Sequence, residues 1–96
     1  MIDKDFTSYS FRKYYIPQRM IAPIKRYVLE HQAPGDFLMA VLRNNLREAI
    51  ERADDENIDH LPAYMALLYN EAPSQCWGSK EKVNNWLNAI KGETGK

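Results

Sequence analysis

NEAPSQCWGSKEKVNNWL, residues 70–87, contains the only cysteine of the chain and both of its tryptophans. Pro73 ends the helix predicted before it, because a proline cannot continue a regular helix. Ser79 is placed to cap the helix that follows. That helix has apolar residues at helical spacing, namely Val83, Trp86, Leu87 and Ile90. We therefore interpret this stretch as the corner at which a small helical fold closes.

The lone cysteine at this corner has two interpretations. As a catalytic nucleophile, Cys76 would need a base and an electropositive setting. The only two histidines are His31 and His60, and the sequence does not give their distance from the thiol. No family signature surrounds Cys76, so we predict a small buried thiol packed next to Trp77. We expect no enzyme activity and no catalytic residue, with a Cys-dependent enzyme as the alternative.

Three further helices are predicted before this corner. The first covers residues 17–31, where Pro23 either bends the helix or lies at a start near residue 22, and we favour the bend. A turn at residues 33–36 leads into the second helix, residues 37–53, and the third covers residues 59–70. The residues predicted to face inward in the second and third helices are Leu38, Val41, Leu42, Leu46, Ala49, Ile50, Ala53, Leu61, Tyr64, Met65 and Leu68.

The segment DDENIDH, residues 54–60, has the carboxylates and imidazole of a metal site. It lacks the glycine and the final glutamate of the familiar calcium loop, and a zinc site would need more nitrogen or sulfur ligands. Negative charge is favourable at a helix N-terminus. We therefore place most of the cluster Asp54, Asp55, Glu56 and Asn57 at the start of the third helix, and we predict no metal and no cofactor.

Composition limits the fold and the compartment. Ninety-six residues are enough for one domain. With 45% apolar and 27% charged residues the chain has enough apolar surface for a core, and its formal net charge is zero. The predicted class is mainly α, a compact bundle of about four helices, with an aromatic N-terminal arm (1–15), a helical domain (16–91) and a frayed tail (92–96). No apolar run reaches the length of a membrane span, and a lone cysteine suits a reducing cytoplasm.

The N-terminal arm is dense in aromatic side chains that follow no regular period. Rings at this density rarely stay in water, so we expect them to pack on the helical body. Tyrosine beside basic residues is also typical of protein interfaces. The candidate partner-binding residues are therefore Phe6, Tyr9, Phe11, Arg12, Lys13, Tyr14 and Tyr15.

Binding to DNA or RNA is the alternative function. Arg43 and Arg47 share a helix face, and Arg12 and Lys13 lie among tyrosines, so these four residues could meet phosphates. Several short helices joined by turns could include a helix-turn-helix. Against this, an acidic cluster separates the second and third helices, and the third helix has no Lys or Arg.

A long string of motifs resembles a family of small uncharacterised proteins of tailed bacteriophages and prophages. It covers roughly residues 16–87, and two positions depart from it: Asn45, where an acidic residue is expected, and Pro23. The matching residues are IPxRM at Ile16, Pro17, Arg19 and Met20, PGDFLxAVLxNxL at Pro34–Leu46, RADDEN at Arg52–Asn57, LPxY at Leu61, Pro62 and Tyr64, and LYNEAPxxCWGS at Leu68–Ser79.

The resemblance implies an origin rather than a chemistry. Short phage proteins often act by blocking or adapting a larger protein, so the expected function is a non-enzymatic protein-binding module that contacts a host or phage protein inside a bacterial cell. A second copy of the chain is a further open partner. Membrane binding is not expected, because the chain has neither a span nor a net positive charge.

Overall fold

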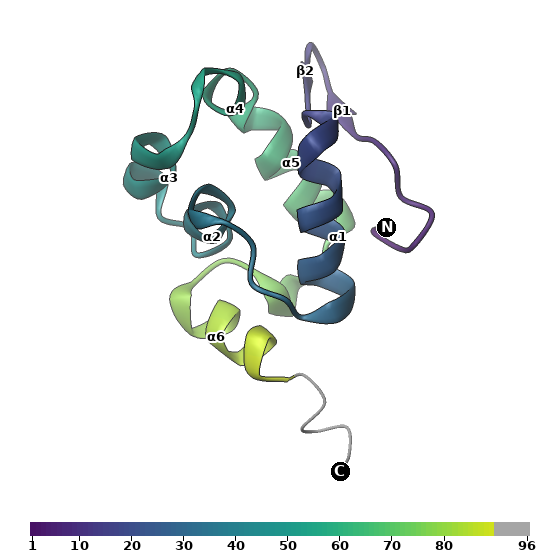
Figure 1. The fold of residues 1–96 in the computed structure, drawn as a ribbon, viewed down its shortest axis with the longest axis vertical. Helices are drawn as coiled ribbons and strands as arrows, with labels where there is room; N and C mark the ends of the chain where they lie inside the picture. The colour runs from purple at the N-terminus through teal and green to yellow at the C-terminus, as the bar shows by residue number, and fades with distance from the viewer. Residues whose placement is uncertain (90–96) are drawn as a thin grey trace.

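The structure, a computed structural model, describes residues 1–89 (Figure 1). The described part is mainly helical, as predicted, but it contains six α-helices and a small sheet rather than about four helices. The predicted tail, residues 92–96, and Ile90 of the last helix lie outside the described residues. The elements are β1 (Ser10–Phe11), β2 (Tyr14–Tyr15), the 3-10 helix η1 (Gln18–Met20), α1 (Ile21–Glu30), α2 (Asp36–Leu42), α3 (Leu46–Arg52), α4 (Asp55–Asp59), α5 (Leu61–Glu71), the 3-10 helix η2 (Ser74–Cys76) and α6 (Lys80–Asn88).

The helix predicted over residues 37–53 is in fact two helices, α2 and α3. Between them, Asn44 adopts the left-handed backbone conformation with a φ of 62°. The Asn45 side chain then accepts a hydrogen bond from the Glu48 amide at 3.1 Å and caps α3. Asparagine tolerates left-handed φ and is a preferred helix cap, so the pair of asparagines overrides the apolar period.

The acidic cluster forms a helix of its own, α4, where we had placed it at the start of the third helix. Asp54 caps this helix, because its Oδ1 accepts a hydrogen bond from the Asn57 amide at 2.8 Å. The predicted role of these charges at a helix N-terminus is therefore confirmed, although the helix is a different one. Asp59 is the last residue of α4 and does not cap α5, which begins at Leu61.

The first helix begins close to Pro23, so the favoured bend was wrong and the alternative start near residue 22 was right. α1 begins at Ile21 and follows the turn of 3-10 helix η1. Pro23 therefore lies in the first turn of α1, where a backbone N–H has no partner within the helix. Its missing donor costs the helix nothing at this position.

The N-terminal arm is a β-hairpin packed on the helical body. β1 and β2 are antiparallel, with Ser10 opposite Tyr15 and Phe11 opposite Tyr14, and both strands contact α5. The turn consists of Arg12 and Lys13, of which Arg12 has a φ of 58°. The predicted packing of the rings is confirmed, since four of them are partly buried against the core: Phe6, Tyr9, Phe11 and Tyr14.

The segment before α6 forms the predicted corner. Cys76 is fully buried. Gly78 has a φ of 113°, which side chains rarely adopt, and its amide donates a hydrogen bond to the Leu42 carbonyl at 2.7 Å. Ser79 caps α6 as predicted, because its Oγ accepts from the Lys82 amide at 3.1 Å. The corner therefore joins the end of α2 to the start of α6.

A reciprocal pair of hydrogen bonds joins α6 to α1. The Trp86 indole Nε1 donates to the Tyr27 carbonyl at 2.9 Å. The His31 Nδ1 lies 2.7 Å from the Trp86 carbonyl oxygen, which can only accept, so this nitrogen is the donor. The two rings also stack, with centroids 4.4 Å apart. We call this arrangement the His31–Trp86 clasp.

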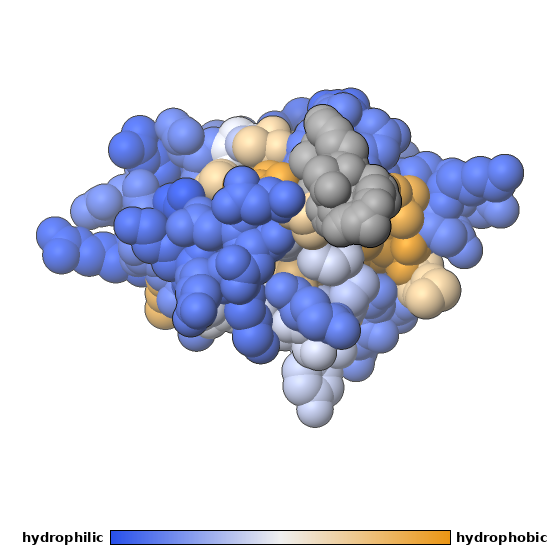
Figure 2. Space-filling model, turned by 90° about the horizontal axis from the view of Figure 1, so that it is seen from below, coloured by the Kyte–Doolittle hydropathy of each residue, from blue (hydrophilic) through white to orange (hydrophobic). Residues whose placement is uncertain are grey.

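The face seen from below in Figure 2 is mainly hydrophilic, with hydrophobic atoms in a few separate places. The longest helix of residues 1–89 is α5, with 11 residues. No helix in this part of the chain has both the length and the apolar character needed to cross a bilayer.

Candidate partner-binding surface

The hairpin leaves only part of the predicted binding arm accessible. Arg12, Lys13 and Tyr15 are exposed. The Arg12 guanidinium lies 5.1 Å from the Phe11 ring centroid, and the Lys13 ammonium lies 5.5 Å from that of Tyr14. The turn therefore places Arg12 and Lys13 together at its tip, while most of the rings stabilise the fold. A role of the arm in partner binding stays a prediction.

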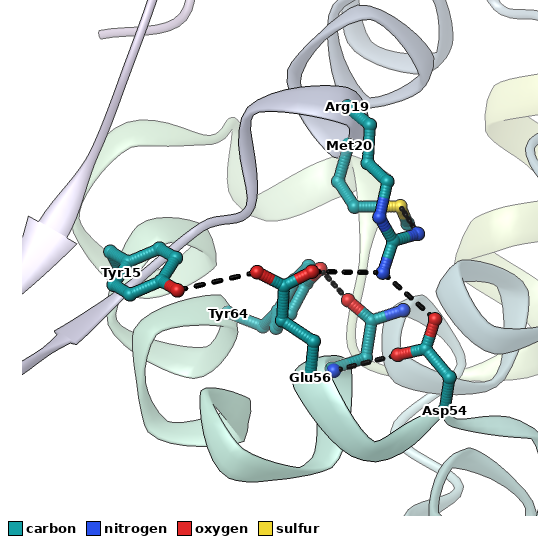
Figure 3. A network of polar contacts seen from close by, with 7 residues as sticks. Tyr15, Arg19, Met20, Asp54, Glu56 and Tyr64 are labelled. Atoms are coloured by element: carbon teal, nitrogen blue, oxygen red, sulfur yellow. Dashed lines mark hydrogen bonds and ion pairs between the residues drawn. The ribbon is translucent and has the colours of Figure 1, made fainter.

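A polar network attaches the hairpin and η1 to α4 (Figure 3). The Arg19 guanidinium lies 2.8 Å from Asp54 Oδ2 and 3.3 Å from Glu56 Oε1, and the Tyr15 hydroxyl donates to Glu56 Oε2 at 3.2 Å. The hydrogen bond with Glu56 raises the pKa of Tyr15. The hydrogen bond from the Asn57 amide, assisted by Arg19, holds the pKa of Asp54 below its usual value. These exposed pairs fix geometry and contribute at most about 1 kcal/mol each.

Beneath this network lies the one buried polar residue of the described chain, Asn57, which is 4% exposed. Its Oδ1 accepts a hydrogen bond from the Tyr64 hydroxyl at 2.6 Å. Burial raises the pKa of Tyr64. Because each buried group has the other as its partner, this bond fixes how α4 sits on α5.

The His60 side chain is occupied by contacts with the hairpin and is therefore not a free base. The Tyr15 amide donates to His60 Nδ1 at 3.1 Å, and the two ring centroids are 3.8 Å apart. An accepting Nδ1 requires the neutral tautomer with its proton on Nε2. The imidazole therefore serves as an anchor for β2.

The environment of Cys76 does not activate a nucleophile. Burial raises the pKa of the thiol to about 11, so it stays protonated near neutral pH. Within residues 1–89 neither imidazole hydrogen-bonds the sulfur, since His31 contacts Trp86 and His60 contacts Tyr15. The predicted buried thiol is confirmed.

Alkaline conditions are expected to destabilise the fold. Burial raises the pKa values of Cys76, Tyr27 and Tyr64 above their ordinary values of 9.0 for the thiol and 10.0 for the phenols. The folded state therefore binds these protons more tightly, and this stabilisation is complete below pH 9 and is lost as the pH rises toward 11 and beyond. Urea unfolding midpoints measured from pH 7 to 11 should fall above pH 9.

Two comparisons check this expectation. The variant Cys76→Ala should lose less stability between pH 9 and 11 than the natural chain, because it lacks one of the three groups. Alkylation of the native thiol at pH 8 should be far slower than in urea. A flat midpoint across this range, or a native thiol that reacts as fast as the unfolded one, would contradict the account.

The acidic cluster does not form a metal site in the described chain. Among residues 1–89, no group of three or more His, Cys, Asp or Glu side chains is arranged to hold an ion. Asp54 caps α4 and pairs with Arg19, and Glu56 pairs with Arg19 and Tyr15. Helix capping and ion pairing account for these two side chains.

The four basic residues of the nucleic-acid alternative do not gather on one surface. Arg12 and Lys13 lie at the hairpin tip, and Figure 1 shows the hairpin well away from α2 and α3. Arg43 is partly buried at the end of α2, with an Nε that has no partner in the described part. Arg47 on α3 is exposed and pairs with Glu51 at 3.5 Å. The structure therefore separates Arg12 and Lys13 at the hairpin tip from Arg43 and Arg47, and the break at Asn44 lies between the latter two.

A groove not predicted from the sequence lies between the α2–α3 break and α5. It has a volume of about 190 Å³, and no charged side chain lines it. The exposed fractions beside it are large for apolar residues, 61% for Leu46 and 36% for Met65, and Ile50, one turn after Leu46, is 46% exposed. We call this surface the α3–α5 groove. It is lined by Val41, Asn44, Asn45, Leu46, Ala49, Leu61 and Met65.

Three of these exposed residues were predicted to face inward, and that prediction was wrong. Leu46, Ile50 and Met65 follow the helical period of buried residues, but the break at Asn44 separates α3 from α2 and leaves Leu46 and Ile50 uncovered. The two consecutive asparagines were the only sequence signal for that break. These apolar residues of α3 and α5 have the spacing of core residues, but no other helix or strand of residues 1–89 covers them. They define the candidate surface.

The fold and this surface define a small, mainly helical protein with an open apolar groove. Comparison of the chain with protein-family models, curated proteins and solved structures gave no match. The resemblance to phage proteins stays a prediction.

Proposed function

We propose that the protein is a non-enzymatic protein-binding module whose contact surface is the α3–α5 groove. The exposure of Leu46 and Met65, which line one concavity, and of Ile50, one turn after Leu46 on α3, carries this proposal. Single exposed apolar residues are ordinary, but a group of them beside a hollow is typical of interaction sites. Burying one such side chain contributes roughly 1.5–3 kcal/mol to binding before the cost of association.

The groove suits a protein side chain better than a metabolite. Its volume of about 190 Å³ is below the range of roughly 300–1,000 Å³ that is usual for small-molecule pockets. The lining is apolar apart from the amides of Asn44 and Asn45, so it offers hydrogen bonds without charge. Such a site fits one or two apolar side chains of a partner, with amide hydrogen bonds at the rim.

Nucleic-acid binding is the second candidate, and the cations at the hairpin tip favour it. Arg12 and Lys13 are exposed and adjacent, as a phosphate contact requires. The other two candidates, Arg43 and Arg47, lie elsewhere, so this surface offers too few phosphate contacts for strong binding. Protein binding is therefore preferred, with a bacterial host or phage protein as the partner that the sequence resemblance implies.

Site-specific photo-crosslinking tests the proposal. A crosslinking residue is placed at Ile50, which is exposed one turn after the groove residue Leu46, and, in a matched protein, at Asn84, which is exposed on α6. In a bacterial lysate we expect a specific adduct from position 50 only. The captured protein is then purified and titrated with the natural chain and with Leu46→Ser and Ile50→Ser.

Each serine variant should weaken binding about tenfold, since each removes roughly 1.4 kcal/mol of apolar contact, and Asn84→Ser should bind like the natural chain. The substitutions are at exposed positions, so the fold should be retained. Equal adducts from positions 50 and 84, or unchanged affinity of both groove variants, would count against the groove.

A further inference from the structure

We infer that the segment held by the α3–α5 groove is a basic amphipathic helix of the partner protein. This inference rests on the proposed function and adds the chemistry of the partner. The two observations behind it are the helical walls of the groove and the negative charge around it.

The segment that forms most of the groove is acidic in a chain whose net charge is zero. Residues 44–69 provide most of the lining and contain two basic and six acidic side chains, a net charge of −4. Arg47 pairs with Glu51 and Arg52 with Glu48, so both basic residues of this segment are already engaged. Electrostatic complementarity therefore favours a cationic partner.

Two carboxylates of this segment are available for a partner. Asp54 and Glu56 are held by Arg19. Asp55 and Asp59 are exposed on α4, and within residues 1–89 neither makes an ion pair. They are four residues apart, so they share one face of the helix, and Ile58 between them is 39% exposed. This pattern places negative charge next to apolar surface.

The helical form of the partner follows from the walls of the groove. Leu46 and Ile50 stand one turn apart on α3, and Met65 stands on α5 with Tyr69, which is 80% exposed, one turn further on. An apolar trough between two helices receives apolar side chains at i, i+3 and i+4 from a third helix. Lysine or arginine beside those positions is expected to meet the carboxylates that are unpaired in the described part of α4, the helix that directly precedes Leu61 of the groove.

The same charge disfavours two other occupants. A second copy of the chain in a two-fold dimer would bring this acidic segment against itself, with Asp55 and Asp59, which make no ion pair within residues 1–89. Nucleic acid would bring phosphates to the same carboxylates. Both arrangements place like charges together, which costs binding free energy.

Three synthetic 18-residue helical peptides test the inference. They share one leucine pattern at i, i+3, i+4 and i+7 and differ only in their polar positions, which are Lys, Gln or Glu. Each is titrated into the full chain, with fluorescence anisotropy for affinity and amide NMR shifts for location. We expect the Lys peptide to bind about tenfold more tightly than the Gln peptide at 20 mM salt, with shifts at Leu46, Ile50 and Met65.

Salt and charge variants separate attraction by charge from apolar contact. The advantage of the Lys peptide should shrink markedly at 0.5 M salt, because exposed charges are then screened within a few Å. In the variant Asp55→Asn/Asp59→Asn, the ratio of the affinities of the Lys and Gln peptides should fall about threefold or more. The control Asp5→Asn/Glu30→Gln makes the same charge change at exposed positions outside the groove lining. In this control the Lys peptide should keep its full advantage over the Gln peptide.

The outcomes distinguish the inference from the proposed function. If the Gln peptide binds at the groove as tightly as the Lys peptide, the apolar groove stands and the basic partner is wrong. If no peptide changes the amide NMR shifts of the groove residues, both the proposed function and the basic helical partner are wrong. A chain that dimerises through Leu46 and Ile50 at micromolar concentration in sedimentation experiments would also overturn the inference, because the charge argument disfavours that dimer.

Discussion

Replacing Trp86 by alanine is expected to lower the free energy of unfolding by about 3 kcal/mol. The change removes the indole from a partly buried site, the Nε1 hydrogen bond to the Tyr27 carbonyl and the stack on His31. The bond from His31 Nδ1 to the backbone carbonyl of residue 86 is the part of the clasp that the alanine variant can keep. Urea denaturation followed by far-UV circular dichroism measures the loss.

Two variants separate packing from hydrogen bonding in this clasp. Trp86→Phe keeps an aromatic ring without the donor and should cost about 1 kcal/mol beyond the difference in ring size. Trp77→Phe, at the partly buried tryptophan outside the clasp, should cost less than Trp86→Ala. A cost below about 1 kcal/mol for Trp86→Ala would show that α6 is held by other contacts.

Replacing Asn57 by alanine is expected to cost about 2 kcal/mol, the second largest effect. The Tyr64 hydroxyl would lose its acceptor in a site where Tyr64 is only 1% exposed, and an unpaired buried hydroxyl costs roughly 1–3 kcal/mol. The substitution leaves the Asn57 backbone amide bonded to Asp54, so the helix cap remains. Thermal and urea unfolding measure the change.

A double-mutant cycle with Tyr64→Phe tests the cause. If the hydrogen bond carries the effect, Asn57→Ala combined with Tyr64→Phe costs less than the sum of the two single variants, because no buried hydroxyl is left unpaired. Additive costs would show that cavity formation, rather than the unpaired hydroxyl, destabilises the Asn57→Ala variant.

Local chemistry predicted several parts of the fold correctly. Ser79 was recognised as a cap because its hydroxyl reaches an amide only three residues away. The negative charges of residues 54–56 were placed at a helix start for the same kind of reason. The turn at residues 33–36 precedes α2, which begins at Asp36. Each of these features depends on residues that are neighbours in the chain.

The break between α2 and α3 was missed because two local signals conflicted. The apolar period runs on through Leu46 and Ile50, while Asn44 and Asn45 favour a stop, and the periodicity was given more weight. A tertiary contact supports the stop, since the amide of Gly78, more than thirty residues later, bonds the Leu42 carbonyl at the end of α2. No pattern within one helix contains that information.

The candidate surface was missed for a related reason. Periodicity shows which residues share a helix face, but not whether anything covers that face. Met65 therefore looked like a core residue, and it is 36% exposed. The aromatic arm was predicted as the contact surface instead, and four of its rings pack against the core.

The interruption at Asn44 and Asn45 makes the groove easy to gain or lose during evolution. Two codons separate a chain with a trough between α3 and α5 from one whose second and third helices could merge into a single straight rod. We expect Asn44→Ala/Asn45→Ala to favour that rod. Related sequences with helix formers at these two positions should then lack the contact surface while keeping the rest of the architecture.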